Sequence, residues 1–270
     1  MNNNTYSLII PVLNRLETLK LMYDSIESEH EINTLLIDNG SEQETVNYLN
    51  KISGNRNTYI TLDSFNKGAS YARNAGLSFA FNEMKSTGAF FIDSDIVLGK
   101  NCLDYLIETN EKENKAIVFS NSQNREGFSY REFLEEGFKP KINSTVFTTT
   151  ECCYITKEVY QKVGNFDDMY YPCYCEDMDY FYRAKLKGYK LINDPKAYHY
   201  HFGDQNPSKD PEFETYKAMR FAVVQDYYTH KWGGTPGHET YTKPFNTDIK
   251  IFVDPLLPEI LRGEKLEKYE

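Results

Sequence analysis

The chain has 270 residues, enough for one large α/β domain or two small ones, and 40% of them are hydrophobic, so a sizeable core is possible. Acidic residues outnumber basic ones by 40 to 30, and the resulting net charge of −10 argues against a general nucleic-acid binder. No signal peptide is recognisable at the N-terminus, and no stretch approaches the ~18 apolar residues that span a bilayer.

The chain is expected to carry its cysteines as free thiols. Their number is odd, two are adjacent, and no Cys-x-x-Cys pair occurs among Cys102, Cys152, Cys153, Cys173 and Cys175. Such a pattern is typical of a reducing compartment rather than of a disulfide framework. We therefore predict a cytoplasmic protein, and a peripheral position at a membrane stays compatible with the sequence.

Strands and helices are predicted to alternate through the first 120 residues. Apolar runs predict strands at 7–12, 32–38, 59–62, 89–93 and 116–120. Apolar residues at helical spacing predict helices at 15–28, 42–51, 69–83 and 101–112. Continuous apolar strands that alternate with helices are typical of a parallel, doubly wound sheet.

The rest of the chain has a less regular pattern. Residues 121–144 are polar and are interpreted as an insertion. A mixed region follows, and from residue 206 onward the chain is predicted to be rich in loops. The elements expected in these parts are a helix at 176–187, a strand at 189–192, a helix near 211–229 and a Gly/Pro segment at 233–237.

Polar residues follow three predicted strands at the points where the strands end. Asp38 closes the second strand, Asn66 begins the turn after the third, and Asp93 and Asp95 follow the fourth. Ligands of open α/β sheets bind beyond the carboxyl ends of the strands. Mg²⁺ and Mn²⁺ take one or two protein carboxylates together with substrate phosphates. The alternative for Asp93 and Asp95 is a solvated Asp-Ser-Asp turn.

Two further clusters carry groups that can bind or transfer protons. Glu176, Asp177 and Asp179 open a predicted helix, where one of them can act as a general base. The helix dipole also favours acids in a first turn, so capping is the alternative. His201 stands before the turn Phe202-Gly203, and a neutral imidazole is a good ligand for Mn²⁺. A structural or solvated histidine is the alternative there.

Taken in order, these motifs resemble a family 2 glycosyltransferase of the GT-A fold. The resemblance covers roughly residues 5 to 205, and each motif is weak alone, while the ordered set is specific. The matching elements are Ile10-Pro-Val-Leu-Asn14, Asp38-Asn-Gly-Ser41, Asn66-Lys-Gly-Ala69, Ala72-Arg-Asn74, Asp93-Ser-Asp95, Val163-Gly-Asn-Phe-Asp167, Glu176-Asp-Met-Asp179 through Arg183, Gly188-Tyr189 and His201.

The resemblance implies an α/β fold of the GT-A type, with a Rossmann-like, mostly parallel sheet flanked by helices. It places a nucleotide-sugar half at 1–120 and a mixed acceptor half at 121–205, which together form one domain over 1–205. The remaining residues, 206–270, are predicted to form a helical and loop-rich C-terminal extension packed on that domain.

The resemblance also implies roles for single residues on the donor side. Asp38 resembles the aspartate that reads the nucleotide base, and Arg73 resembles the basic residue near the donor phosphates. A charge on a helix surface is the alternative for Arg73. With the segment described below, the residues predicted to bind the donor are Pro11, Asp38, Asn66, Gly68, Arg73, Asp93, Ser94, Lys231 and Trp232.

The implied reaction is the inverting transfer of a sugar, such as a hexose, from a nucleotide diphosphate sugar to an acceptor hydroxyl. A UDP-sugar is the expected donor. Asp93 and Asp95 resemble the pair that binds Mn²⁺ or Mg²⁺, and His201 resembles the histidine that completes the metal or pyrophosphate shell. The metal would hold the diphosphate as Lewis acid and template. Asp177 resembles the catalytic base, and Glu176 beside it binds the acceptor or positions the base.

The chain departs from the family pattern at two places. The commoner family motif after the second strand is Asp-Asp-Gly-Ser, whereas this chain has Asp38-Asn-Gly-Ser41. Asn39 thus replaces the second aspartate, and one carboxylate is lost. Family members also often carry a small residue or glycine near position 150, where this chain has Thr149-Thr-Glu-Cys-Cys153. The second departure leaves the geometry on the acceptor side open.

The segment 228–237 combines glycines with aromatic and basic residues. Such a composition is typical of a mobile loop that closes over a diphosphate. In this hypothesis Lys231 or His230 contacts a donor phosphate, and Trp232 packs on a sugar. The alternative is a surface loop with one buried tryptophan.

Two other functions are compatible with parts of the pattern. A nucleotidyltransferase can share the sheet and the acidic metal site, but it needs a glycine-rich phosphate loop after the first strand, where this chain has Leu13-Asn-Arg-Leu16. A non-catalytic carbohydrate- or nucleotide-binding protein is the second alternative. The acceptor stays open among a glycan, a lipid-linked sugar, a protein side chain and a modified nucleobase, as does the oligomeric state.

Overall fold

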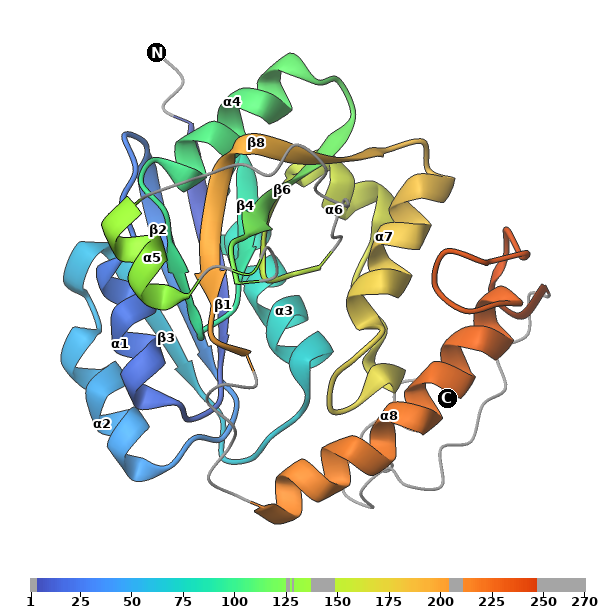
Figure 1. Ribbon diagram of the computed structural model, residues 1–270, viewed down its shortest axis with the longest axis horizontal. Helices are drawn as coiled ribbons and strands as arrows, with labels where there is room; N and C mark the ends of the chain where they lie inside the picture. The colour runs from blue at the N-terminus through green and yellow to red at the C-terminus, as the bar shows by residue number, and fades with distance from the viewer. Residues whose placement is uncertain (1–3, 125–126, 128, 137–148, 204–210, 247–270) are drawn as a thin grey trace.

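The computed structural model describes residues 4–124, 127, 129–136, 149–203 and 211–246 (Figure 1). Parts of the predicted insertion and of the predicted C-terminal extension lie outside these residues. In chain order the strands are β1 (Thr5–Val12), β2 (Glu31–Asp38), β3 (Thr58–Leu62), β4 (Gly88–Ile92), β5 (Ile96–Leu98), β6 (Ala116–Ser122), β7 (Cys152–Thr156) and β8 (Lys190–His201).

Helices alternate with these strands, as the sequence predicted. In chain order they are α1 (Leu16–Asp24), α2 (Gln43–Ile52), α3 (Ala69–Ser78), α4 (Cys102–Lys112), α5 (Tyr130–Glu136), α6 (Lys157–Val163), α7 (Glu176–Leu186) and α8 (Pro211–Trp232). The predicted helix at 69–83 is α3 followed by a π-helical turn over Phe79–Glu83. None of the described helices combines the length and the apolar character needed to cross a membrane.

The described strands form one sheet in the order β3-β2-β1-β4-β7-β6-β8-β5. The strands β1 to β4 run parallel to one another, which confirms the predicted parallel sheet in this part of the chain. The strand β7 runs antiparallel to β4 and β6, and the short β5, which the sequence did not predict, runs antiparallel to β8. The sheet is therefore mostly parallel in its first half and mixed in its second.

Helices cover both faces of the sheet (Figure 1). Alternate residues of β1 point to opposite faces, so Leu8 and Ile10 pack with α1, α2 and α4, whereas Ile9 packs with α3, α6 and α7. All three side chains are fully buried. A strand buried on both faces requires a continuous apolar run, which is why the sequence signal of these strands was strong.

The strand β8 is longer than the sequence predicted. The prediction stopped at residue 192 because Asn193, Asp194 and Pro195 disfavour strands, yet β8 continues to His201. Side chains satisfy the backbone at this irregular stretch: the Asp194 carboxylate accepts from the Lys196 and Ala197 N–H groups at 2.6 and 3.0 Å. The longer strand pairs His201 with Ile96 of β5 and so brings His201 beside the end of β4.

The hypothesis of a mobile loop that carries Lys231 and Trp232 is wrong. The helix α8 extends to Trp232, and both side chains are almost completely buried, with 2% and 1% exposed. Trp232 belongs to an apolar cluster that α8 forms with residues preceding α7, among them Tyr170 and Cys175. Tyr228, Lys231 and Trp232 are thus used for packing within the protein, whereas His230 is exposed on α8 and does not line the cavity described below.

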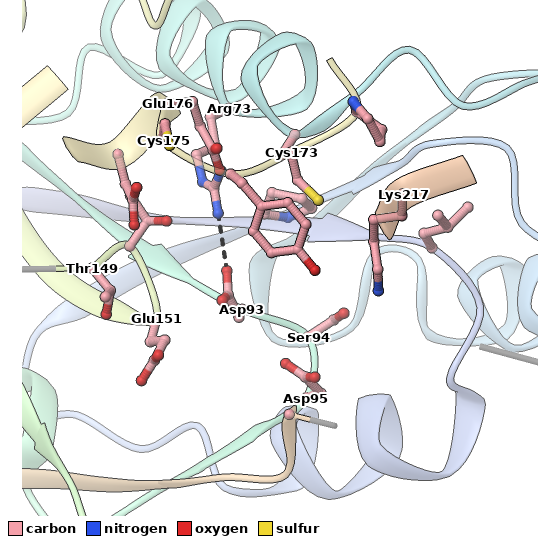
Figure 2. A pocket seen from close by; sticks show the side chains of 18 of the residues that line it. Arg73, Asp93, Ser94, Asp95, Thr149, Glu151, Cys173, Cys175, Glu176 and Lys217 are labelled. Atoms are coloured by element: carbon pink, nitrogen blue, oxygen red, sulfur yellow. Dashed lines mark hydrogen bonds and ion pairs between the residues drawn. The ribbon is translucent and has the colours of Figure 1, made fainter. Parts of the chain in front are cut away.

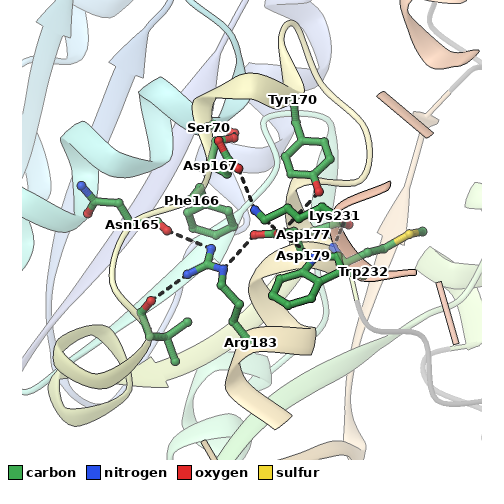
Figure 3. A network of polar contacts seen from close by, with 12 residues as sticks. Ser70, Asn165, Phe166, Asp167, Tyr170, Asp177, Asp179, Arg183, Lys231 and Trp232 are labelled. Carbon is green, nitrogen blue, oxygen red and sulfur yellow. Dashed lines mark hydrogen bonds and ion pairs between the residues drawn. The ribbon is translucent and has the colours of Figure 1, made fainter. Parts of the chain in front are cut away.

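Lys231 is the cation of a buried polar network (Figure 3). Its Nζ lies 2.6 Å from Asp167 Oδ2 and 2.6 Å from Asp179 Oδ1. Burial raises the pKa of both carboxyl groups, but the charge of Lys231, together with hydrogen bonds and, for Asp179, the charge of Arg183, brings both pKa values below the usual range. Trp232 Nε1 also donates to Asp179 Oδ1 at 2.8 Å, and Arg183 Nε donates to Asp179 Oδ2 at 2.8 Å. The network fixes the end of α8 against the first turn of α7.

We expect Lys231→Ala to destabilise the protein strongly. The change leaves Asp167 and Asp179 buried without their shared cation, and removing one partner of a buried ion pair costs about 3–5 kcal/mol. Lys20→Ala is the control, because the Lys20–Glu17 pair is exposed and contributes about 0–1 kcal/mol. Chemical denaturation measures both free energies of unfolding, and equal effects of the two changes would contradict the structural role of Lys231.

Candidate active site

A cavity of about 540 Å³ lies at the carboxyl ends of β1 and β4 (Figure 2). Helix α7, the segment before it and α8 complete its walls. Most of the residues that the sequence singled out line this cavity, namely Pro11, Asn66, Arg73, Asp93, Ser94, Asp95, Glu176, Asp177 and His201. The other four do not line it: Asp38 is fully buried, the Gly68 carbonyl accepts a hydrogen bond from Asn39, and Lys231 and Trp232 belong to the network at the end of α8.

Asp93, Asp95 and His201 meet although more than 100 residues separate the first from the last. One ligand atom from each lies within 4.8 Å of the others, and His201 Nε2 is 3.2 Å from Asp95 Oδ1. Asp95 is only 6% exposed, so it is not part of a solvated turn. Carboxylate oxygen and imidazole nitrogen are donors that Mn²⁺ accepts, and the donor set therefore fits a divalent ion of this kind.

Glu151 is a site residue that the sequence analysis missed. The strand β7 runs antiparallel to β4, so the residue before β7 lies beside the residue after β4, and the Asp93 N–H donates to the Glu151 carbonyl at 3.0 Å. Its carboxylate lies 3.4 Å from His201 Nδ1 and 3.3 Å from His199 Nε2. His199 Nδ1 is in turn 2.5 Å from Ser120 Oγ. The available signal was a carboxylate directly before an apolar strand.

The ring of His201 is held between two carboxylates. Its Nδ1 faces Glu151 and its Nε2 faces Asp95. Burial lowers the pKa of His201, but the hydrogen bonds and charges of Asp95 and Glu151 raise it to about 10. Burial likewise raises the pKa of Asp95, while His201 and Arg15 bring it below its usual range. Glu151 thereby fixes which ring nitrogen of His201 faces the ligand cluster, as outer carboxylates do at metal sites.

Arg15 is a second site residue that the sequence analysis did not assign. It follows the carboxyl end of β1 in a turn where Asn14 and Arg15 have φ values of 57° and 55°. The turn brings its guanidinium to Asp95 Oδ2, with which it forms an ion pair. Its position directly after the first strand was the available signal, because ligands bind at this edge of the sheet.

Arg73 joins the two acidic parts of the cavity (Figure 2). Its guanidinium donates to Glu176 Oε1 at 2.7 Å and to Asp93 Oδ1 at 3.2 Å. Arg73 is 5% exposed, so the alternative of a charge on a helix surface is wrong. One side chain of α3 therefore links the end of β4 to the start of α7.

The three acids at the start of α7 have three different environments. Glu176 contacts Arg73, Asp177 lines the cavity, and Asp179 points to the network of Lys231. Burial and the neighbouring Glu176 charge raise the pKa of Asp177 to about 7, although Arg73 lowers it. A carboxyl group that gains and loses its proton near neutral pH is suited to general acid–base chemistry.

The departure at Asn39 has a structural reason. Its Nδ2 donates to Asn66 Oδ1 at 2.9 Å and to the Gly68 carbonyl at 3.1 Å, and its Oδ1 accepts from the Lys67 N–H at 2.8 Å. An ionised aspartate cannot donate these hydrogen bonds. Asn39 therefore ties the turn after β2 to the turn before α3. The neighbouring Asp38 is fully buried, and its carboxylate accepts from the Ser41 N–H at 3.3 Å.

The sequence matches the model of glycosyl transferase family 2 over residues 7–165, which is more than half of the chain. The chain therefore belongs to this family. A curated relative, the uncharacterized glycosyltransferase YfnE of Bacillus subtilis (strain 168), is 29% identical over 139 residues. That match covers 50% of this chain and 34% of the relative, so the chain spans about a third of the length of that relative.

Several solved structures share the fold. The mannosyltransferase PcManGT from Pyrobaculum calidifontis, in complex with GDP-Man and Mn²⁺, has a TM-score of 0.60 and 16% identity, with 96% of this chain and 68% of that chain covered. The S. aureus TarS fragment 1–349 with UDP-GlcNAc has a TM-score of 0.56 and 18% identity, with 82% and 66% covered. GalNAc-T7 with UDP, GalNAc and Mn²⁺ has a TM-score of 0.58 and 16% identity, with 74% and 44% covered. The predicted GT-A fold is confirmed.

We expect Glu151→Gln to weaken Mn²⁺ binding by about 10–100-fold, the usual effect of losing an outer carboxylate of a metal-ligating histidine. The amide keeps the shape of the side chain but loses the negative charge that orients His201. Electron paramagnetic resonance of free Mn²⁺ measures the affinity, and Glu113→Gln, in a largely exposed ion pair with Lys190, is the control. An unchanged Mn²⁺ affinity in folded Glu151→Gln would contradict this role.

Proposed function

We propose that this chain transfers a sugar from a nucleotide diphosphate sugar to an acceptor hydroxyl with inversion at the anomeric carbon. The observation that carries the proposal is that one cavity is lined both by the ligand cluster Asp93, Asp95 and His201 and by Asp177. The pKa of Asp177 is raised to about 7. Membership of glycosyl transferase family 2 supports the proposal and favours it over the nucleotidyltransferase alternative.

A UDP-sugar is the donor that we propose, and a GDP-sugar is the alternative to test. The solved structures of similar fold contain UDP, UDP-GlcNAc or GDP-Man, and two of them contain Mn²⁺. Asp38 is fully buried and does not line the cavity. It therefore acts on the nucleobase of the donor indirectly, through the turn that it supports. Pro11 and Asn66 line the cavity at the same edge of the sheet and are the residues that we expect to touch the nucleoside.

The donor diphosphate is expected to lie at the ends of β1 and β4. Mn²⁺ or Mg²⁺, held by Asp93, Asp95 and His201, would supply Lewis-acid stabilisation of the leaving diphosphate. The guanidinium groups of Arg15 and Arg73 lie at the two aspartates and add positive charge close to the leaving group. Ser94, between the two aspartates, also lines the cavity and can donate a hydrogen bond to a phosphate oxygen.

Asp177 is the general base of the proposed reaction. Its carboxylate takes the proton of the acceptor hydroxyl as the oxygen attacks the anomeric carbon on the face opposite the diphosphate. The bond to the diphosphate breaks, and the nucleotide leaves with its electron pair. Glu176 is held by Arg73 and raises the pKa of Asp177, so the base is strong enough to accept a proton at neutral pH.

The activity is tested directly by nucleotide release. The chain is incubated with Mn²⁺ and a panel of UDP- and GDP-sugars, with and without sugar acceptors, and released UDP or GDP is measured. We expect release from one donor that an acceptor accelerates. Binding of a nucleotide sugar without release or transfer would favour the non-catalytic alternative. No binding and no release from any donor would overturn the proposal.

We expect Asp177→Asn to lower the rate of transfer by about 10²–10⁴-fold, the range that a general base contributes. The amide has the same shape but cannot accept the proton. Donor affinity, measured by thermal shift, is expected to stay within about threefold, because the base acts on the acceptor. Asp24→Asn, an exposed acid of α1, is the control and leaves both quantities unchanged. Full activity of Asp177→Asn would exclude this residue as the base.

The transfer rate should rise with pH and level off above pH 7. The base works only when it is deprotonated, and the pKa of Asp177 is raised to about 7. Below that value the rate falls about tenfold for each pH unit, because the deprotonated fraction falls by that factor. Steady-state rates at saturating donor and acceptor between pH 5 and pH 9 measure the profile. A rate that is constant across this range would contradict a titrating base at position 177.

We also propose a cytoplasmic location, one domain over residues 1–205 with an extension over 206–270, and an acceptor that bears a hydroxyl group. The contacts of α8 with the residues before α7 support an extension that packs on the same domain.

A further inference from the structure

One wall of the cavity consists of apolar side chains that the proposed mechanism does not use. Tyr174 comes from the segment before α7, Met178 from the first turn of α7, and Phe221 from α8. Their exposed fractions are 37%, 37% and 42%, although Tyr170 and Tyr228 close by in the chain are almost completely buried. Large apolar side chains that stay exposed inside a cavity are typical of a surface that contacts a ligand.

One face of α8 forms part of this wall. Phe213, Lys217, Phe221 and Gln225 all line the cavity, and their spacing of four residues places them on the same side of the helix. Side chains of α8 outside this series, among them Val224, are buried in the apolar cluster beside α7. The helix is therefore anchored by one side and presents the other to the cavity.

The two aromatic rings of the wall have a definite arrangement. The ring centroids of Tyr174 and Phe221 are 5.1 Å apart, and the ring planes are inclined by 80°. Perpendicular rings cannot hold a flat nucleobase between parallel faces, but they leave an aromatic face and an edge for a puckered ring. Tyr174 also has a φ of 80°, which non-glycine residues rarely adopt and which recurs at ligand sites.

The polar groups around the rings are those that a neutral polyhydroxyl compound requires. Gln225 stands one helical turn beyond Phe221 and offers an amide donor and an amide acceptor. Lys217, one turn before Phe221, is paired with Glu214 at 2.6 Å, so its charge is compensated within the protein. The wall therefore combines aromatic surface with hydrogen-bonding groups and adds no net positive charge for a phosphate-bearing acceptor.

We propose that this wall, made of Phe213, Lys217, Phe221, Gln225, Tyr174 and Met178, is the acceptor site and that the acceptor is a neutral sugar. The inference rests on the proposed function and narrows its acceptor. The apolar C–H face of a pyranose lies against Tyr174 and Phe221, its rim hydroxyls reach Gln225, and one hydroxyl faces Asp177 in the same cavity. A flat nucleobase and a polyol-phosphate acceptor fit the wall less well, because its rings are perpendicular and the charge of Lys217 is paired with Glu214.

Saturation-transfer NMR tests the site with defined probes. The protein is studied with Mg²⁺ and UDP, and the probes are methyl glycosides of glucose, galactose, mannose, N-acetylglucosamine and N-acetylgalactosamine. We expect at least one glycoside to bind and Phe221→Ala to weaken that binding by about tenfold or more, as loss of a phenyl contact does. Met219→Ala is the matched control: Met219 is on the same helix and 56% exposed but does not line the cavity, so its loss leaves binding unchanged.

The outcomes separate this inference from the proposed function. Sugar binding that Phe221→Ala leaves unchanged would overturn the site. Binding of a serine peptide, a nucleoside or a glycerol phosphate oligomer by the wild type, with no glycoside bound, would overturn the acceptor class. Binding of nucleotide sugars and release of UDP or GDP, measured with and without acceptor, report on the proposed function. The absence of both binding and release for every donor would overturn the proposed function, whereas the glycoside experiment is read independently of it.

Discussion

The candidate site depends on charge compensation by one buried side chain, the guanidinium of Arg73. Several carboxylates face the same cavity, and like charges at low dielectric repel one another strongly. Arg73 contacts Asp93 on one side and Glu176 on the other, so it holds the end of β4 to the start of α7. Arg15 provides the corresponding contact to Asp95. Without these cations the acids could not stay buried at such short range.

The same charge compensation gives the acidic residues of the site different roles. Asp93 and Asp95 have cationic neighbours and can face a metal ion and a diphosphate. Glu176 takes a hydrogen bond from Arg73, and its charge together with burial keeps the pKa of Asp177 near neutral. Asp179, two residues further on, is turned toward α8 and has a structural role. One short acidic segment therefore serves positioning, proton transfer and packing, because each side chain leaves the helix in a different direction.

The helix α8 lies in the part of the chain beyond the family match and contributes to the cavity. Its last turn is locked to α7 through Lys231 and Trp232, and one of its faces continues the cavity wall past Asp177. The family model ends at residue 165, so the wall made by α8 is a feature of this chain that the family match does not describe. This wall lies in the same cavity as the proposed base Asp177, and it combines aromatic surface with hydrogen-bonding groups. Both properties favour the wall as the surface that selects the acceptor.

The sequence by itself determined the elements of the first half apart from the short β5, together with the parallel strands β1 to β4 and the candidate residues at their ends, because buried strands and strand-end acids are local signals. It did not reveal Glu151, Arg15 or the burial of Lys231. Glu151 reaches His201 only through the antiparallel pairing of β7 with β4 and the extension of β8. Lys231 resembles a phosphate ligand in sequence, and only the tertiary structure decided its role, because its partners Asp167 and Asp179 lie more than 50 residues away in the chain.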